Sequence, residues 1–304
     1  MAPTGGADGG LPIHVRLMGP DPGPEVESFI LLHGYGGSSF SWRFWAPRLA
    51  QRGHVVLVDL KGFGLAPRPR DDAYGPRDHA HLVVRYILER DLANVTLVGH
   101  SLGGLVALLA ALDLLNGGAA AEPDRMGAQP PSISRLIRLV SVSGAAYPQK
   151  LPPFVAVARR RRLSRILFAL TPKRLLVRTV LRQIVYDPAT VTREQIEGYA
   201  APLRIPGTAD ALIRTAQQII PPDAEAFMAR YPEIRVPALL LWGREDRVVP
   251  PEVGEHLTRE LPRARLAVLE ECGHLPPEER PDASYSVLEE FLEENPLHRS
   301  RANV

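Results

Sequence analysis

The sequence predicts an α/β protein with a mostly parallel central sheet, helices on both faces of the sheet and an inserted helical cap. Short, continuously apolar segments alternate with helix-like segments along most of the chain, a pattern typical of parallel strands that are buried on both faces. The alternation stops between residues 148 and 232, where amphipathic helical stretches are separated by proline pairs. We therefore expect a core made of residues 1–147 and 233–304, with a cap made of residues 148–232.

Seven strands are expected along the chain. Residues 14–18 alternate between polar and apolar side chains, which predicts an initial strand. The other strands are expected in short apolar runs, several of which end at a glycine-rich or polar turn. These runs cover residues 28–33, 55–59, 95–98, 136–142, 237–242 and 265–269.

Helices and loops are expected between these strands. Helical periodicity is present in residues 81–92, and residues 105–115 form an apolar segment closed by two glycines, which predicts a buried helix. Residues 282–294 predict a closing helix. Residues 116–134, which are rich in Gly, Ala and Pro, predict a loop, and residues 1–10 are expected to be disordered.

Composition excludes several classes of protein. Hydrophobic residues make up 45% of the 304 residues and charged residues 23%, which is ordinary for a globular protein and excludes a mostly disordered chain. The single cysteine, Cys272, excludes an intramolecular disulfide and is expected to be a buried packing residue. The sequence shows neither a secretory signal nor a run of 18 apolar residues, so we expect a cytoplasmic location.

Charge is distributed unevenly. The net charge of +2 gives no argument for a nucleic-acid partner, and none is expected. Residues 150–182 of the expected cap, however, contain ten Lys and Arg and no Asp or Glu. The stretch predicts basic amphipathic helix, for which two interpretations remain. It could contact anionic substrates or weakly contact an anionic membrane surface. The favoured interpretation is a solvated cap face whose apolar side covers a pocket.

A candidate nucleophile lies in residues 99–103, which read Gly-His-Ser-Leu-Gly and fit the pattern G-x-S-x-G. This pattern is typical of a sharp strand-to-helix turn that exposes a serine at the start of a helix, and that serine is Ser101 here. The segment follows an expected strand and precedes an apolar helix, which is the context that the turn requires. The free N–H of Leu102 at the helix start could stabilise a developing oxyanion. A second N–H is expected from the glycine-rich turn 33–37, with Tyr35 as first choice and Gly36 as second.

A serine nucleophile needs a base, and a histidine oriented by a carboxylate is the usual one. His274 is the best placed because it lies in the loop after the last expected strand. His33 and His100 adjoin the two glycine-rich motifs and are expected to shape loops. The histidines expected on the surface or at the terminus are His79, His81, His256 and His298.

The orienting carboxylate is expected from Asp246. It follows the strand that ends at Trp242 and would therefore lie at the same sheet edge as Ser101 and His274. Glu245 is the adjacent alternative.

Together these segments resemble the α/β-hydrolase superfamily over the whole chain. The matching segments are the His33-Gly34 turn, residues 59–64, the Ser101 turn, the Asp246 loop and the His274 loop. Residues 59–64 look like the family's D-x-x-G-x-G turn, and the resemblance implies a structural role for them. It also implies the nucleophile–acid–base order Ser, Asp, His.

Within the superfamily, a cap-containing esterase- or lipase-like serine hydrolase is favoured. A serine at position 101 argues against the branches that carry an aspartate nucleophile, the haloalkane dehalogenases and epoxide hydrolases. The cap also resembles that of the carbon–carbon bond hydrolases that act on ring-cleavage products. Those enzymes usually carry a tryptophan after the catalytic histidine, where this chain has Leu275.

We therefore expect hydrolysis of a medium-sized carboxylic ester with a largely apolar acyl part, through an acyl-enzyme. The apolar part is expected because the cap is rich in Leu, Ile, Val and Phe. Neither a cofactor nor a metal is expected. Two alternatives remain: a carbon–carbon bond hydrolase of a dienoic ketone, and a non-catalytic binding module on the same fold. The sequence leaves the oligomeric state open.

Overall fold

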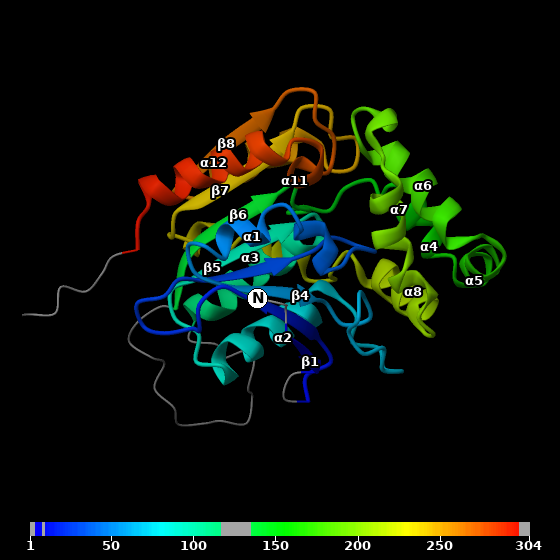
Figure 1. Ribbon diagram of the computed structural model, residues 1–304, viewed down its shortest axis with the longest axis horizontal. Helices are drawn as coiled ribbons and strands as arrows, with labels where there is room; N and C mark the ends of the chain where they lie inside the picture. The colour runs from blue at the N-terminus through cyan, green and yellow to red at the C-terminus, as the bar shows by residue number, and fades with distance from the viewer. Residues whose placement is uncertain (1–3, 8–9, 117–134, 298–304) are drawn as a thin grey trace, which may run out of the picture.

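The central sheet has eight strands and is parallel except at one edge. The computed structural model describes residues 4–7, 10–116 and 135–297. The strand order is β1-β2-β4-β3-β5-β6-β7-β8, with antiparallel pairing only between β1 and β2 and between β2 and β4 among the described strands (Figure 1). The strands are β1 (Thr4–Ala7), β2 (His14–Met18), β3 (Ser28–Leu32), β4 (His54–Asp59), β5 (Val95–His100), β6 (Leu136–Val142), β7 (Ala238–Gly243) and β8 (Ala264–Leu269).

Strand β1 corrects one expectation. Residues 4–7 pair with residues 14–17 of β2, although residues 1–10 were expected to be disordered. A glycine-rich segment carries no strand signal of its own. Its pairing depends on the unpaired backbone edge that β2 presents.

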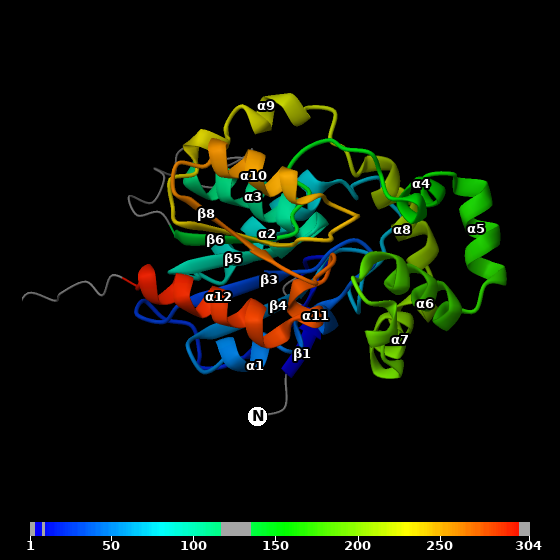
Figure 2. The same cartoon turned by 90° about the horizontal axis from the view of Figure 1, so that it is seen from above.

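Helices cover both faces of the sheet, as Figure 2 shows. Helices α2 (Pro76–Glu89), α3 (Leu102–Leu115) and α10 (Pro251–Glu260) pack on one face. Helices α1 (Ala46–Leu49), α11 (Pro276–Glu279) and α12 (Pro281–Glu294) lie on the other. Each face has its own apolar core, and the buried side chains of β3 alternate between the two cores.

Helix α2 begins earlier than its periodicity predicts. The expected segment was 81–92, but the helix starts at Pro76 and ends at Glu89. Proline at the first helical position is pre-organised for a helix, and the Asp78 carboxylate accepts a hydrogen bond from the Gly75 N–H at 2.8 Å. Of the loop expected at 116–134, residues 117–134 lie outside the described residues.

A group of cap helices stands beside the carboxyl ends of the parallel strands (Figures 1 and 2). They are α4 (Pro153–Ala158), α5 (Arg161–Leu170), α6 (Lys173–Ile184), α7 (Arg193–Ala200) and α8 (Thr208–Gln218). The following short helix, α9 (Ala224–Met228), packs instead into the core through Ala224 and Phe227. The helical block between β6 and β7 thus leaves the core and returns to it.

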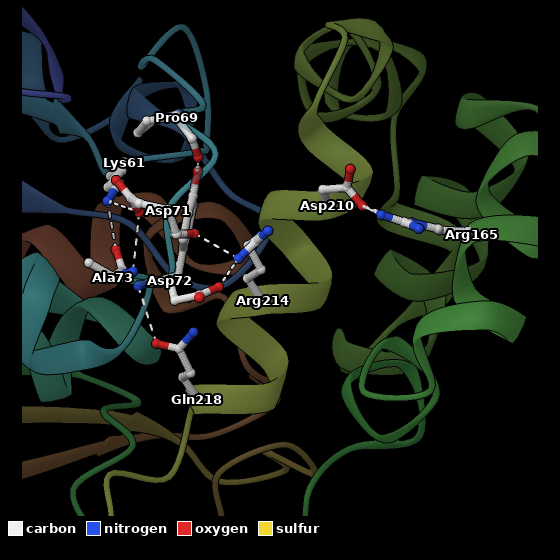
Figure 3. Close-up of polar contacts among 10 residues, drawn as sticks. Lys61, Pro69, Asp71, Asp72, Ala73, Arg165, Asp210, Arg214 and Gln218 are labelled. Atoms are coloured by element: carbon white, nitrogen blue, oxygen red, sulfur yellow. Dashed lines mark hydrogen bonds and ion pairs between the residues drawn. The ribbon is translucent and has the colours of Figure 1, made fainter.

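Helix α8 is fastened to the loop that follows β4, as Figure 3 shows. Arg214 donates a hydrogen bond to the carbonyl oxygen of Asp71 at 2.7 Å and forms an ion pair with Asp72. Lys61 in turn contacts the Asp71 carboxylate at 2.6 Å. These contacts hold the base of the cap against the sheet edge. Within the described residues, no helix is long and apolar enough to cross a membrane.

His79 was expected on the surface, and that expectation is wrong. The side chain is fully buried on the inner face of α2, close to the ring of Phe63. Burial is the main cause that lowers the pKa of His79, to about 3.

We predict that His79 lowers the stability of the protein in mild acid. Its ordinary pKa is 6.5 and its folded value about 3, so between these values only the unfolded chain binds the proton. The free energy of unfolding therefore falls as the pH drops below 6.5, by up to about 1.4 kcal/mol per pH unit from this group. His79→Leu should make the fall shallower, measured by urea unfolding between pH 7 and pH 4. Identical slopes for the two proteins would contradict the prediction.

Candidate active site

Ser101 occupies a strained turn between β5 and α3. Its backbone has φ 53° and ψ −116°, a conformation that costs free energy in a residue other than glycine. The turn is possible because its flanks have no side chains. A Cβ at Gly99 would lie 2.1 Å from the carbonyl oxygen of Gly103, and a Cβ at Gly103 would lie 2.2 Å from that of Leu32. This close packing holds Ser101 at the carboxyl edge of the sheet.

A cavity of about 430 Å³ lies between this edge and the cap, and Ser101 lines it. His274 from the core also reaches it, as do Leu167 and Phe168 from α5 and Leu212 from α8. No Lys, Arg, Asp or Glu side chain from the described part of the chain lines the cavity. The space around Ser101 is therefore predominantly apolar.

Two backbone N–H groups beside Ser101 are free to bind a ligand. Leu102 is the first residue of α3 and Tyr35 lies in a turn closed by a hydrogen bond from the Gly37 N–H to the Gly34 carbonyl, at 3.0 Å. Among the described residues, neither the Leu102 nor the Tyr35 N–H has a hydrogen-bond partner, and both residues line the cavity. First-turn N–H groups of helices have no intrahelical partner and favour negative charge.

The Tyr35 side chain links this turn to the cap. Its hydroxyl donates a hydrogen bond to the Leu212 carbonyl in α8, at 2.9 Å. Burial raises the pKa of Tyr35, so the hydroxyl keeps its proton at neutral pH. The sequence left the position of this side chain open.

His274 and Asp246 form a buried pair. The Nδ1 atom of His274 lies 2.8 Å from Oδ2 of Asp246. The other carboxylate oxygen accepts hydrogen bonds from the N–H groups of Val248 at 2.8 Å and Val249 at 2.9 Å. Because a carboxylate only accepts, the imidazole Nδ1 donates, which leaves Nε2 as the proton acceptor.

The alternative carboxylate, Glu245, lies elsewhere. Its side chain accepts a hydrogen bond from the Cys272 N–H at 2.9 Å and so stabilises the loop that leads to His274. Cys272 itself is fully buried, and burial is the main cause that raises the pKa of its thiol. A protonated thiol without access to the cavity is a poor nucleophile.

His33 and His100 connect backbone segments. His33 accepts a hydrogen bond from the Leu60 N–H at 3.0 Å and donates one to the Gly34 carbonyl at 2.8 Å. His100 donates a hydrogen bond through Nε2 to the His274 carbonyl at 2.8 Å. Burial is the main cause that lowers the pKa of His100, to about 3. His100 is therefore neutral at pH 7, and its hydrogen bond to the His274 carbonyl stabilises the His274 loop.

Asp59 also has structural contacts. Its carboxylate accepts hydrogen bonds from the N–H groups of Ser39 at 2.6 Å and Leu65 at 2.9 Å, and it contacts His14 at 3.1 Å. These bonds join the loops after β3 and β4. No group of three or more His, Cys, Asp or Glu side chains in the described residues is arranged to hold a metal ion.

Sequence reasoning missed Glu279, which joins the His274 loop to the cap. Its Oε2 atom accepts hydrogen bonds from the N–H groups of Gly273 at 2.9 Å and Tyr186 at 2.7 Å. Its Oε1 atom accepts one from the Leu275 N–H at 2.9 Å. The His274 N–H donates to the Ile184 carbonyl at the end of α6, at 2.8 Å. No local pattern signals these bonds, because Tyr186 lies far from Glu279 in the sequence.

Comparisons with known proteins agree with this architecture. Residues 29–286 match the family described as "Alpha/beta hydrolase family". An uncharacterized hydrolase of Bacillus subtilis is 29% identical over 273 residues, covering 88% of this chain and 91% of that protein. A 2-hydroxy-6-oxononadienedioate/2-hydroxy-6-oxononatrienedioate hydrolase of Burkholderia vietnamiensis is 27% identical over 279 residues, covering 90% and 89%.

Solved structures give the same result. The 2-hydroxy-6-oxo-6-phenylhexa-2,4-dienoate hydrolase of a Rhodococcus species aligns with a TM-score of 0.72 at 25% identity, over 96% of this chain and 98% of that one. The matched family segment spans the sheet from β3 onward, the cap helices and the loops that carry Ser101, Asp246 and His274. This chain belongs to the alpha/beta hydrolase family.

Proposed function

We propose that the protein is a serine hydrolase that cleaves a carboxylic ester through an acyl-enzyme on Ser101. One observation carries the proposal. A serine in a strained turn shares a cavity with His274, which is paired with the buried Asp246, and with two residues whose backbone N–H groups are unpaired among the described residues. A nucleophile, a base with its orienting acid and an oxyanion site are the parts that acyl transfer requires.

The reaction proceeds in two stages. Ser101 Oγ attacks the ester carbonyl carbon while His274 Nε2 takes the hydroxyl proton, and the N–H groups of Leu102 and Tyr35 bind the oxyanion. His274 then gives the proton to the leaving oxygen, and the alcohol departs. A water molecule attacks the acyl-enzyme with His274 as base, which releases the carboxylic acid and restores Ser101. Asp246 holds the imidazole in orientation and stabilises its cation. Apart from this water molecule, the reaction uses only groups of the chain, so it requires no cofactor, and we expect it to occur in the cytoplasm.

The cavity favours an apolar acyl group. Its lining is largely aliphatic and aromatic and contains no Lys, Arg, Asp or Glu among the described residues. Burying an ionised group in such surroundings without a partner is costly. A neutral ester with a medium-sized apolar acyl part therefore fits better than an acidic substrate.

Carbon–carbon bond hydrolysis is the second candidate, because two of the similar proteins are named as hydrolases of dienoate or dienedioate ketones. Such substrates carry one or two carboxylates, for which the described cavity lining offers no cationic partner apart from histidine. This chain also has Leu275 directly after His274, where the carbon–carbon bond hydrolases usually carry a tryptophan.

The third alternative is a non-catalytic binding module. Such a module would have no need of a strained serine beside a buried His–Asp pair.

We predict that the protein hydrolyses p-nitrophenyl esters and that Ser101→Ala lowers the rate by about 10³-fold or more, because the substitution removes the nucleophile. The measurement is release of p-nitrophenolate across acyl chains from acetate to palmitate. Ser286→Ala, which changes an exposed serine on α12, is the matched control and should retain full activity.

Two results would change the assignment. Turnover of a vinylogous diketone without turnover of any ester would select carbon–carbon hydrolysis. Failure of Ser101 to react with a phosphonate probe, together with inactivity on both substrate classes, would support the binding module.

We predict that Glu279 positions His274 for this reaction. Glu279→Gln replaces one acceptor oxygen by an NH₂ group that would face backbone N–H donors, so the His274 loop should shift. Displacements of this kind cost up to about 10²-fold in rate, and we expect kcat to fall at least tenfold with KM little changed. Glu278→Gln is the control, because the Glu278 side chain contacts Gln195 at 2.9 Å, Arg43 at 2.7 Å and the Tyr199 hydroxyl, and none of its described hydrogen bonds reaches residues 273–275. Equal effects of the two variants on kcat would refute the positioning role.

A further inference from the structure

Helix α5 is the outermost helix of the cap and buries none of its ten residues, all of which the structure describes (Figures 1 and 2). A helix in a globular protein normally packs an apolar face against its neighbours. Here Ile166 is 57% exposed and Leu170 is 79% exposed. The exposed apolar residues of α4, α5 and the start of α6 form one set that we call the α5 patch: Val157, Leu163, Ile166, Leu167, Leu170 and Leu175.

The α5 residues of this patch lie on one side of the helix. Leu163, Ile166, Leu167 and Leu170 follow the spacing of i, i+3, i+4 and i+7, which places them in a single stripe. Arg165 lies off this stripe and forms an ion pair with Asp210 of α8, at 2.6 Å (Figure 3). This pair links α5 to α8 through a residue outside the apolar stripe.

The segment that carries most of the α5 patch is rich in cations, and most of them have no carboxylate partner among the described residues. Residues 150–182 contain ten Lys and Arg and no acidic residue. Arg165 pairs with Asp210 and Arg174 pairs with Glu197. The remaining eight cations have no carboxylate partner within the described parts of the chain, and residues 159–162 form an exposed run of four arginines. The patch is therefore both apolar and strongly positive.

The combination of apolar and positively charged residues limits what kind of partner can bind the α5 patch. A second copy of the same face would bring two strongly positive surfaces together, which is unfavourable. A nucleic acid would satisfy the arginines but would leave the aliphatic side chains in contact with water. An anionic lipid bilayer satisfies both requirements, since its headgroups attract Lys and Arg while its interfacial region accepts aliphatic side chains.

We propose that α5 is an interfacial helix that docks the cap on an anionic lipid bilayer. The apolar stripe enters the headgroup region, and the arginines bind lipid phosphates. The attraction between basic residues and such a surface is electrostatic, so salt screens it. The docking depends only on the outside of the cap and not on catalysis.

Docking would also place the cavity mouth at the bilayer. Val157 and Leu167 belong to the α5 patch and also line the cavity, as does the exposed Ile220. The cavity therefore opens beside the docked face. If the proposed ester hydrolysis holds, its substrate class is a lipophilic ester dissolved in the membrane, which would enter the cavity without crossing water.

The test is co-sedimentation of full-length Ser101→Ala protein with vesicles, which keeps lipid intact during the measurement. We expect binding to vesicles of phosphatidylcholine with 30% phosphatidylglycerol at low salt, at least tenfold weaker binding at 0.5 M NaCl, and little binding to pure phosphatidylcholine. Ile166→Asp/Leu170→Asp should weaken binding at least tenfold. The control is Leu65→Asp, which changes an exposed leucine outside the α5 patch and should bind as the parent does.

A second variant separates charge from apolar contact. Replacing Arg160, Arg161 and Arg162 by glutamine should weaken binding and flatten its salt dependence. Circular dichroism and turnover of a soluble ester, measured with Ser101 restored, check that each variant is folded. Absence of binding to anionic vesicles at low salt would overturn the docking, as would α5-patch variants that dissolve a dimer while leaving vesicle binding unchanged. Vesicle binding by a protein inactive on every ester would uphold the docking and refute the ester hydrolase.

Discussion

The site depends on the close approach of backbones around Ser101. The turn at φ 53° is possible because Gly99 and Gly103 carry no side chain: a Cβ at Gly99 would lie 2.1 Å from the Gly103 carbonyl oxygen, and a Cβ at Gly103 would lie 2.2 Å from that of Leu32. The same constraint leaves the Leu102 N–H unpaired and directs Ser101 into the cavity. Strain held by surrounding structure in this way is typical of functional sites.

The two sides of the site are held by different means. On the core side, Asp246 is fixed by backbone N–H groups and in turn fixes His274. On the cap side, Tyr35 bonds to α8 and Glu279 bonds to the segment after α6. The His274 loop therefore contacts both the core and the cap. A displacement of α6 would therefore shift the His274 loop. The cap thus helps to position the catalytic histidine and also covers the cavity.

The cap has contrasting inner and outer surfaces. Its inner side lines a cavity without Lys, Arg, Asp or Glu among the described residues, while residues 150–182 place ten cations on and around its outer side. The sequence favours a solvated outer face whose apolar side covers a pocket, which would require the apolar residues of α5 to point inward. Leu167 and Phe168 do line the cavity, but Ile166 and Leu170 are exposed. That division is the basis for the proposed docking on a membrane.

The sequence alone predicted the α/β class, the later strands and the loops that carry Ser101, Asp246 and His274. These features could be predicted because apolar periodicity and glycine spacing are local properties. The sequence did not predict β1, the start of α2 or the burial of His79, and it left Glu245 open beside Asp246. Only the tertiary structure decided these points, together with the Glu279 contacts and the exposure of α5. Each depends on which distant segment becomes a neighbour, and a local pattern carries no information about that.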